Sequence, residues 1–226
     1  MSKPYLPATL NHCTSCLFEH DMSHAFRDSD TTALGSPPLI VHLRPVLELS
    51  DERLFEFCKI NRDLRIERTA QGDLVILPPT GAETGNRNAE LTMQLRIWTK
   101  RDGTGASFDS STGFRLPNGA MRSPDASWVR HSRLEGLTPE EKRKFIPLAP
   151  DFAVELRSAT DRLEIVQEKM QEYAENGTAL GWLINPELKR VSICRPGRPV
   201  EQIVEPSSIS GEPVLPGFVL DLNEIW

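Results

Sequence analysis

The stretch Ser123–Tyr173 decides the fold, through the segments SPDASWV (123–129), PDFAVEL (150–156) and DRLEIVQEKMQEYAENG (161–177). The first two segments are apolar, strand-like runs that carry Asp125 and Glu155. The third predicts a helix in which Lys169 and Tyr173, four residues apart, lie on one face. Two acids and a lysine on adjacent elements form the side-chain set that metal-dependent phosphodiester hydrolysis needs.

The residues on the C-terminal side of this stretch predict a β-α-β unit. The helix, expected over Asp161–Asn176 with Gly177 as its cap, is followed by the strand-like run LGWLI (180–184). A helix between two strands is long enough for the crossover that parallel strands require. Glu155 then lies at the carboxyl end of its strand, where open α/β sheets place their sites.

The rest of the chain predicts further alternation of helices and strands. Ser50 caps a short helix, and the segment 131–150 is expected to be a loop with one short helix beginning at Thr138–Pro139. The other expected elements are a hairpin (64–68 and 73–77), a helix (84–100) and strands at 105–108, 113–117, 190–195, 200–204 and 214–222. This order predicts the α/β class, with a mixed β-sheet flanked by α-helices.

Two regions of different character divide the 226 residues. Residues 1–38 are polar and without helical or strand period, and they end in Gly-Ser-Pro-Pro, so we expect a flexible N-terminal extension. Within it, the pair Cys13 and Cys16 is too sparse a pattern to indicate a zinc site. Residues 39–226 are expected to form the globular domain.

The amino-acid composition is that of a globular protein and not of a membrane-spanning one. Hydrophobic residues make up 38% and charged residues 26%, as in globular proteins, and no run approaches the roughly 18 apolar residues of a membrane span. Four unevenly spaced cysteines and the lack of a secretory signal indicate a reducing compartment, so we expect a cytoplasmic protein without a membrane partner.

The formal net charge of −6 is unusual for a nucleic-acid-binding protein, which is more often basic. A carboxylate metal site contributes negative charge that bound cations offset. Basic residues also gather locally, as in the group Arg87, Arg96, Lys100 and Arg101. These residues either contact phosphates or form a solvated surface, and the sequence leaves both alternatives open.

The chemistry expected of the central stretch is metal-assisted. Magnesium keeps most of its waters and binds one or two carboxylates at roughly 2.1 Å, so Asp125 and Glu155 on neighbouring strands would suffice. A lysine beside the metal orients the attacking water and balances the charge of the transition state. Each residue taken alone also has a structural reading, as a turn aspartate, a solvated glutamate or a solvent-facing lysine.

The order and spacing of several segments resemble the Uma-two (Uma2) family of bacterial restriction-endonuclease-like proteins, in the PD-(D/E)xK nuclease superfamily. The segments are PDASWV, PDFAVELRSATD, QEKMQEYAENG, LGWLINPE and VSICRPG, with RIERTAQGDLVILPPTGAETGNRNAELTMQL and GFRLPNGAMRSPDASWV upstream. The likeness covers about Leu39 to Trp226 and leaves out the first 38 residues.

This resemblance implies roles for individual residues. Asp125 matches the aspartate of the PD motif and Glu155 the acid of the second motif, which makes both of them catalytic and metal-binding. Arg157 stands where the superfamily usually has its lysine, and Lys169 with Tyr173 matches a family tendency to place the lysine on the following helix. Arg157 and Tyr173 are therefore expected to support the site. Asn88 stands where the family often has a histidine, which leaves the role of Glu83, Asn88 and Glu90 open.

The function expected from residues and resemblance together is that of an endonuclease dependent on Mg²⁺ (or Mn²⁺). Its substrate is expected to be DNA rather than RNA, and a homodimer is expected because such enzymes often cut two strands. The alternative is a catalytically inactive nuclease-fold module that binds nucleic acid or protein.

Overall fold

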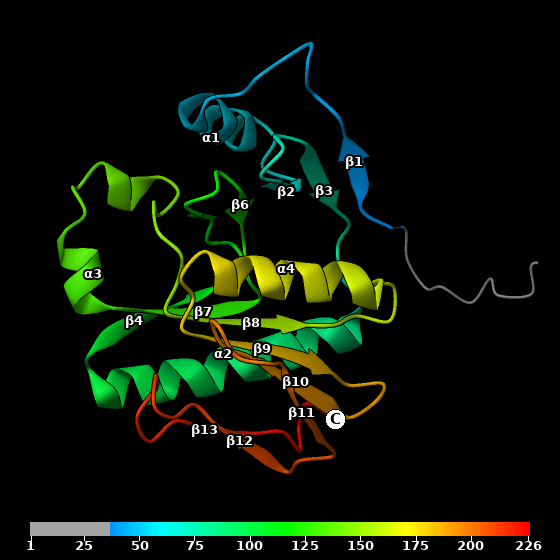
Figure 1. Ribbon diagram of the computed structural model, residues 1–226, viewed down its shortest axis with the longest axis vertical. Coiled ribbons are helices and arrows are strands. Elements are labelled where there is room, and N and C mark those ends of the chain that lie inside the picture. The colour runs from blue at the N-terminus through cyan, green and yellow to red at the C-terminus, as the bar shows by residue number, and fades with distance from the viewer. Residues whose placement is uncertain (1–36) are drawn as a thin grey trace, which may run out of the picture. The chain divides into compact units, whose positions relative to one another are not determined.

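Three β-sheets and four α-helices organise residues 37–226, the part of the chain that the computed structural model describes (Figure 1). Residues 1–36 of the expected N-terminal extension lie outside that part, so the extension stays a prediction. The α/β class is confirmed. Among the residues described, no helix combines the length and the apolar character needed to cross a membrane.

The largest sheet has six strands in the order β11-β10-β9-β8-β7-β4. Strands β8 and β9 pair in parallel and the other neighbours are antiparallel, so this sheet is mixed as expected. Helix α4 (Leu163–Glu175) connects the two parallel strands, and Gly177, with a φ of 98°, follows its end. The strands are β4 (Gly105–Asp109), β7 (Ala126–Arg130), β8 (Phe152–Leu156), β9 (Leu180–Asn185), β10 (Arg190–Cys194) and β11 (Glu201–Val204).

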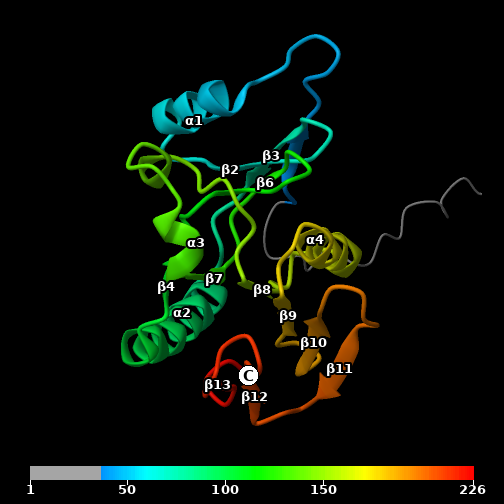
Figure 2. The same cartoon turned by 60° about the vertical axis from the view of Figure 1, so that its left-hand side comes forward.

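The two faces of this sheet bury different helices. Helix α2 (Ala82–Asp102) covers one face and α4 the other (Figures 1 and 2). Successive strand residues point to opposite faces, so Phe152 and Val154 pack in the cluster that contains Leu91 of α2. Ala153 packs instead in the cluster that contains Tyr173 of α4. On β8, odd-numbered residues therefore face α4.

A second sheet of five antiparallel strands follows the order β1-β3-β2-β6-β5. Strands β2 and β3 form the expected hairpin, and helix α1 (Asp51–Ile60), capped by Ser50, packs on this sheet through Leu54 and Ile66. The strands are β1 (Leu39–Val41), β2 (Arg65–Arg68), β3 (Leu74–Leu77), β5 (Phe114–Arg115) and β6 (Met121–Arg122).

The expectation of one mixed sheet was therefore incomplete. The chain leaves the five-stranded sheet at Arg122 and enters the six-stranded sheet at Ala126. Pro124 lies between them and has no N–H to donate to a strand ladder. This short connection joins the two sheets directly at Asp125.

The segment 131–150 also differs from expectation. Helix α3 (His131–Glu135) begins directly after β7, and only a 3₁₀ turn, Glu141–Arg143, follows the Thr138–Pro139 signal. Thr138 and Glu141 cap each other, since each backbone N–H donates to the other's side-chain oxygen. The capping signal is real, but the helix it starts is a single turn.

The C-terminal residues add a two-stranded sheet that the sequence predicted only in part. Strands β12 (Ser208–Ser210) and β13 (Val219–Asp221) pair antiparallel. Gln94 of α2 exchanges two hydrogen bonds with the backbone of Asp221, at 3.0 and 2.8 Å. The hairpin therefore closes the core on the α2 side of the six-stranded sheet.

Candidate active site

Strand register brings Asp125 and Glu155 together. Ala126 pairs with Val154 in the antiparallel β7–β8 ladder, so continuing the register by one residue sets Asp125 opposite Glu155. Directly opposed side chains in such a ladder have Cβ atoms about 5 Å apart. The backbone N–H of Leu156 donates to Asp125 Oδ2 at 2.9 Å, which fixes the aspartate against the end of β8. Both acids are buried.

Helix α4 adds Lys169 and Tyr173 to this pair. Lys169 Nζ lies 2.9 Å from Glu155 Oε1, and the Tyr173 hydroxyl donates to the same oxygen at 2.9 Å. The one-turn spacing of the two residues places both on the face of α4 that lies against β8. The structure thus brings together Asp125, Glu155, Lys169 and Tyr173.

Arg157 lies apart from that group. Its Nε donates to the carbonyl oxygen of Asp161 at 3.1 Å, and its guanidinium forms an ion pair with Glu187. Within residues 37–226 it has no ion pair with Asp125 or Glu155. Although its backbone N–H still donates to Ile184 of β9, the contacts of the Arg157 side chain with Asp161 and Glu187 direct the guanidinium away from the acids.

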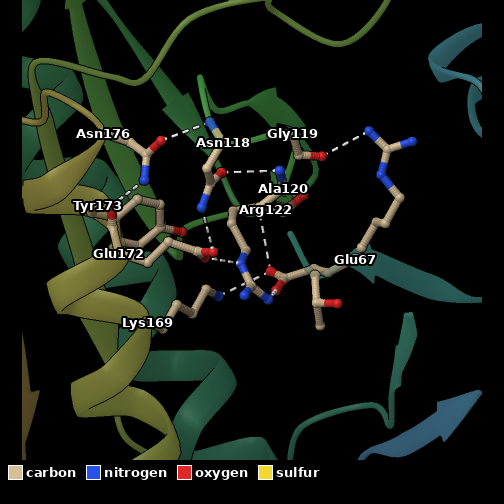
Figure 3. Close-up of polar contacts among 12 residues, drawn as sticks. Glu67, Asn118, Gly119, Ala120, Arg122, Lys169, Glu172, Tyr173 and Asn176 are labelled. Carbon is tan, nitrogen blue, oxygen red and sulfur yellow. Dashed lines mark hydrogen bonds and ion pairs between the residues drawn. The ribbon is translucent and has the colours of Figure 1, made fainter. Parts of the chain in front are cut away.

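Strand β2 of the five-stranded sheet contributes two residues that the sequence reading missed. Glu67 Oε1 accepts from Lys169 Nζ at 2.9 Å (Figure 3). The same oxygen accepts from the Ser123 backbone N–H at 3.0 Å. Arg65, two positions earlier and so on the same face of the strand, donates to Asp125 Oδ1 at 3.3 Å. Lys169 therefore has two carboxylate partners, Glu155 and Glu67.

Arg122 of β6 ties this cluster to α4. Its Nε donates to Glu172 Oε2 at 2.6 Å, and its Nη1 lies 3.3 Å from Glu67 Oε2 (Figure 3). Asn118, in the turn before β6, donates from its side chain to Glu172, and its backbone N–H donates to the side chain of Asn176. The acids and cations of the site thus form one network between α4 and both sheets.

Burial and charge shift the pKa values of the group. Burial, aided by the nearby acids Asp125 and Glu67, raises the pKa of Glu155 to about 7, although Lys169 opposes the shift. Burial acts to lower the pKa of Lys169, but Glu155 and Glu67 outweigh it and raise that pKa. Burial acts to raise the pKa of Glu67, but Lys169 and Arg122 hold it below its ordinary value.

These shifts assign the charges at neutral pH. Lys169 carries its proton and Glu67 is ionised, whereas Glu155 exchanges its proton near neutrality. Burial, and then the charge of Glu155, raises the pKa of Tyr173 well above its ordinary value, so its hydroxyl is neutral and acts as a hydrogen-bond donor. Lys169 is accordingly suited to orienting groups and balancing charge, and not to accepting a proton.

Asp125 and Glu155 suit a metal ion that binds two carboxylates and takes its other ligands from water. Across residues 37–226, no three His, Cys, Asp or Glu side chains are arranged to hold an ion together. Asp125 and Glu155 supply two carboxylates, and Glu155 Oε2 accepts no hydrogen bond from the residues described. This donor set could hold an ion such as magnesium, which binds one or two carboxylates and retains its waters.

A pocket of 460 Å³ opens beside Asp125. The lining comes mainly from α2 and from the end of β4, and it consists of Asn88, Ala89, Thr92, Met93, Arg96, Asp109, Ser110 and Asp125. Of the three α2 residues whose role was open, Asn88 reaches the pocket, and its Oδ1 is buried without a hydrogen-bond partner in the described chain. Glu83 pairs instead with Arg87, and Glu90 with Gln94.

The signal that could have revealed Arg65 and Glu67 lies in the segment RIER. Ile66 is buried in the core of the five-stranded sheet, so its two charged neighbours must face the other way. When one face of a strand is buried and the other is charged, the charged face contacts either solvent or a polar site. The sequence does not show which, because the partners of these residues in the site lie 55 or more positions away.

Comparisons with known proteins give the family and the fold that this chain resembles. Residues 51–223 match the sequence model of the Uma2 family, whose description reads "Putative restriction endonuclease". A solved structure from Anabaena variabilis, titled as a putative nuclease belonging to DUF820, superposes with a TM-score of 0.60 at 20% identity, covering 71% of this chain and 88% of that one. The two chains therefore share a fold. A search of curated proteins found no match.

Proposed function

The chain belongs to the Uma2 family of restriction-endonuclease-like proteins, and from this membership and the site geometry we propose that it is a divalent-metal-dependent endonuclease acting on DNA. The observation that carries the proposal is the 2.9 Å contact between Lys169 Nζ and Glu155 Oε1, next to Asp125. It supports Lys169, and not Arg157, as the lysine of the site.

The proposed roles follow from the contacts. Asp125 and Glu155 hold the metal ion, Mg²⁺ or Mn²⁺, which when bound supplies charge neutralisation and a more acidic water. Lys169 orients the attacking water and offsets negative charge on the phosphate. Tyr173 fixes the orientation of the Glu155 carboxylate through its hydroxyl.

The pocket beside Asp125 supports a path for the substrate backbone. Arg96 supplies a positive charge there, and Ser110 and Thr92 supply hydroxyl donors. Side chains of these kinds make most of the phosphate contacts in protein–DNA complexes. The proposal includes a homodimer, because a twofold-symmetric pair of sites would cut both strands of a duplex together.

A second candidate is a nuclease-fold module that binds nucleic acid or protein without cleaving it. The net charge of −6 and the lack of a three-acid metal cluster among the residues described favour it. This module would bind DNA equally well with and without magnesium, and it would leave DNA intact.

Plasmid cleavage with Mg²⁺ or Mn²⁺ tests the proposal and the lysine assignment together. We expect the wild type to cleave, Lys169→Met to lose at least about 100-fold in rate because the charge beside the phosphate is lost, and Arg157→Met to stay within about threefold of the wild type. Arg157→Met is the matched control, because it removes a cation from the end of β8 that does not contact the acids.

Three outcomes separate the candidates. Loss of cleavage in Arg157→Met alone would reverse the lysine assignment. Binding without cleavage by the wild type, under both metals, would favour the non-catalytic module. Metal-dependent cleavage of RNA but not of DNA would overturn the substrate class.

A further inference from the structure

Lys169 is held by two buried carboxylates that come from different sheets. Its Nζ lies 2.9 Å from Glu155 Oε1 on the six-stranded sheet and 2.9 Å from Glu67 Oε1 on the five-stranded sheet. Asp125 and Glu155 account for the proposed metal site, so Glu67 has no assigned role in it. Yet Glu67 is as deeply buried as the other acids, with 2% of its surface exposed.

The position of Lys169 conflicts with metal binding unless its charge has a second partner. The ammonium occupies the same carboxylate that a divalent ion needs, and like charges at close range in a buried site repel strongly. A lysine held by Glu155 alone would compete with the ion. If the ion displaced it, the lysine would be left buried without a partner, which is strongly unfavourable.

We propose that Glu67 is a positioning residue that retains Lys169 in the site when a divalent metal ion occupies Asp125 and Glu155. The inference rests on the proposed function, since it concerns how the lysine and the metal share one set of acids. Lys169 contacts both glutamates. With an ion held by Asp125 and Glu155, the lysine would keep its contact with Glu67 while Glu155 turned to the ion.

The surroundings of Glu67 suit this task. Its Oε1 also accepts from the Ser123 backbone N–H at 3.0 Å, and its Oε2 lies 3.3 Å from Arg122 Nη1, so the carboxylate is fixed independently of Lys169. It belongs to β2, which carries neither metal acid. Metal binding can therefore change the contacts of Glu155 without moving Glu67.

A double-mutant cycle tests whether Glu67 positions Lys169, with the affinity for Mn²⁺ measured by calorimetry. Mn²⁺ is titrated into the wild type, Glu67→Gln, Lys169→Met and the double variant, with plasmid cleavage run in parallel. We expect Glu67→Gln to weaken Mn²⁺ binding about tenfold, because Lys169 then competes for Glu155. In the Lys169→Met background the same substitution should change affinity less than about threefold, because no lysine remains to retain.

Glu172→Gln is the matched control. Glu172 is a carboxylate of the same network that pairs with Arg122 and has no contact with Lys169 among the ion pairs described. We expect its Mn²⁺ affinity to stay within about threefold of the wild type. If Glu67→Gln does not fold, Glu67→Asp carries the test in both backgrounds: it keeps the charge but draws it back by one methylene, so it should weaken binding only when Lys169 is present.

The outcomes distinguish this inference from the proposed function. A wild type that binds Mn²⁺ and cleaves DNA, together with unchanged affinity in Glu67→Gln, would overturn the role of Glu67 alone. An equal loss of affinity in both backgrounds would mean that Glu67 acts directly on the ion, and would also overturn it. A wild type that binds no Mn²⁺ would overturn the proposed function and this inference together.

Discussion

If Glu155 holds the proposed metal ion, proton binding and metal binding compete at this residue. Its pKa is raised to about 7, chiefly by burial, so below that pH the carboxyl is protonated in the folded protein. A protonated carboxyl must lose its proton before it can coordinate a cation. Metal affinity should therefore be fully present about one pH unit above this pKa and fall as the pH decreases through it.

Calorimetry at two pH values measures this linkage. We expect Mg²⁺ binding to weaken about tenfold for each pH unit below about 6, and to be nearly constant above about 8. Titrations near pH 6 in buffers of different ionisation enthalpy should show up to one proton released per ion bound. An affinity that does not change between these values would contradict the raised pKa of Glu155.

Residue identities in the site were only partly predictable from the chain. Asp125, Glu155 and Lys169 could be found because each lies on or next to a strongly patterned element, and the helix directly follows the Glu155 strand. Glu67 and Arg65 could not, because their partners Lys169 and Asp125 lie 102 and 60 positions away. Local pattern shows that a strand has a charged face, but it carries no information about which distant side chain meets that face.

Helix α2 offers the clearest prediction at the scale of an element. Arg96 lines the pocket beside Asp125, whereas Lys100, one turn further along the helix, does not. If the pocket carries the DNA backbone, Arg96→Ala should weaken DNA binding and reduce the slope of log affinity against log salt by about one.

Lys100→Ala serves as the control for that measurement, since it removes the same charge from the exposed surface of the same helix. Its salt slope should match that of the wild type. Both titrations use catalytically inactive Lys169→Met protein in order to keep the DNA intact. Equal effects of the two substitutions would indicate general electrostatic attraction and no specific path through the pocket.

At this scale the longer elements were predictable and the short ones were not. Helix α2 was expected over 84–100 and spans Ala82–Asp102, with Gly103 in the left-handed conformation at its end. Strand β5 was expected over 113–117 and spans only Phe114–Arg115, and the two-residue strand β6 was not expected, because two residues cannot establish a period. Because those short strands complete the five-stranded sheet, the sequence suggested one sheet where the structure has three.

Across the whole described molecule, Arg122 is the central link between the five-stranded sheet and α4. It pairs with Glu67 on one side and Glu172 on the other, and its own side chain is largely buried. Removing one member of a buried ionic network leaves the others without compensation, which costs about 3–5 kcal/mol. Arg122→Met should therefore lower the free energy of unfolding by about that amount, as measured by urea denaturation.

Hydrogen exchange shows which elements lose stability in Arg122→Met. Amides of α4 should exchange faster in Arg122→Met than in the wild type, while amides of the central strand β9 should change only with global stability. Arg87→Met is a suitable control, because the pair of Arg87 with Glu83 lies within α2 and has an exposed partner. A destabilisation below about 1 kcal/mol, as for surface pairs, would contradict the linking role.

The separation of the site residues along the chain also constrains the order in which the site assembles during folding. Tyr173 and Glu155 are 18 positions apart, whereas Lys169 and Glu67 are 102 positions apart. The longer loop is about two and a half doublings of the shorter one, so closing it costs about 1.5 kcal/mol more in chain entropy. The β8–α4–β9 unit should consequently form first, with Lys169 bound to Glu155 alone. A newly folded chain then acquires the second carboxylate partner of Lys169, Glu67, only when the five-stranded sheet docks, so the two-acid setting of the lysine is completed late in folding.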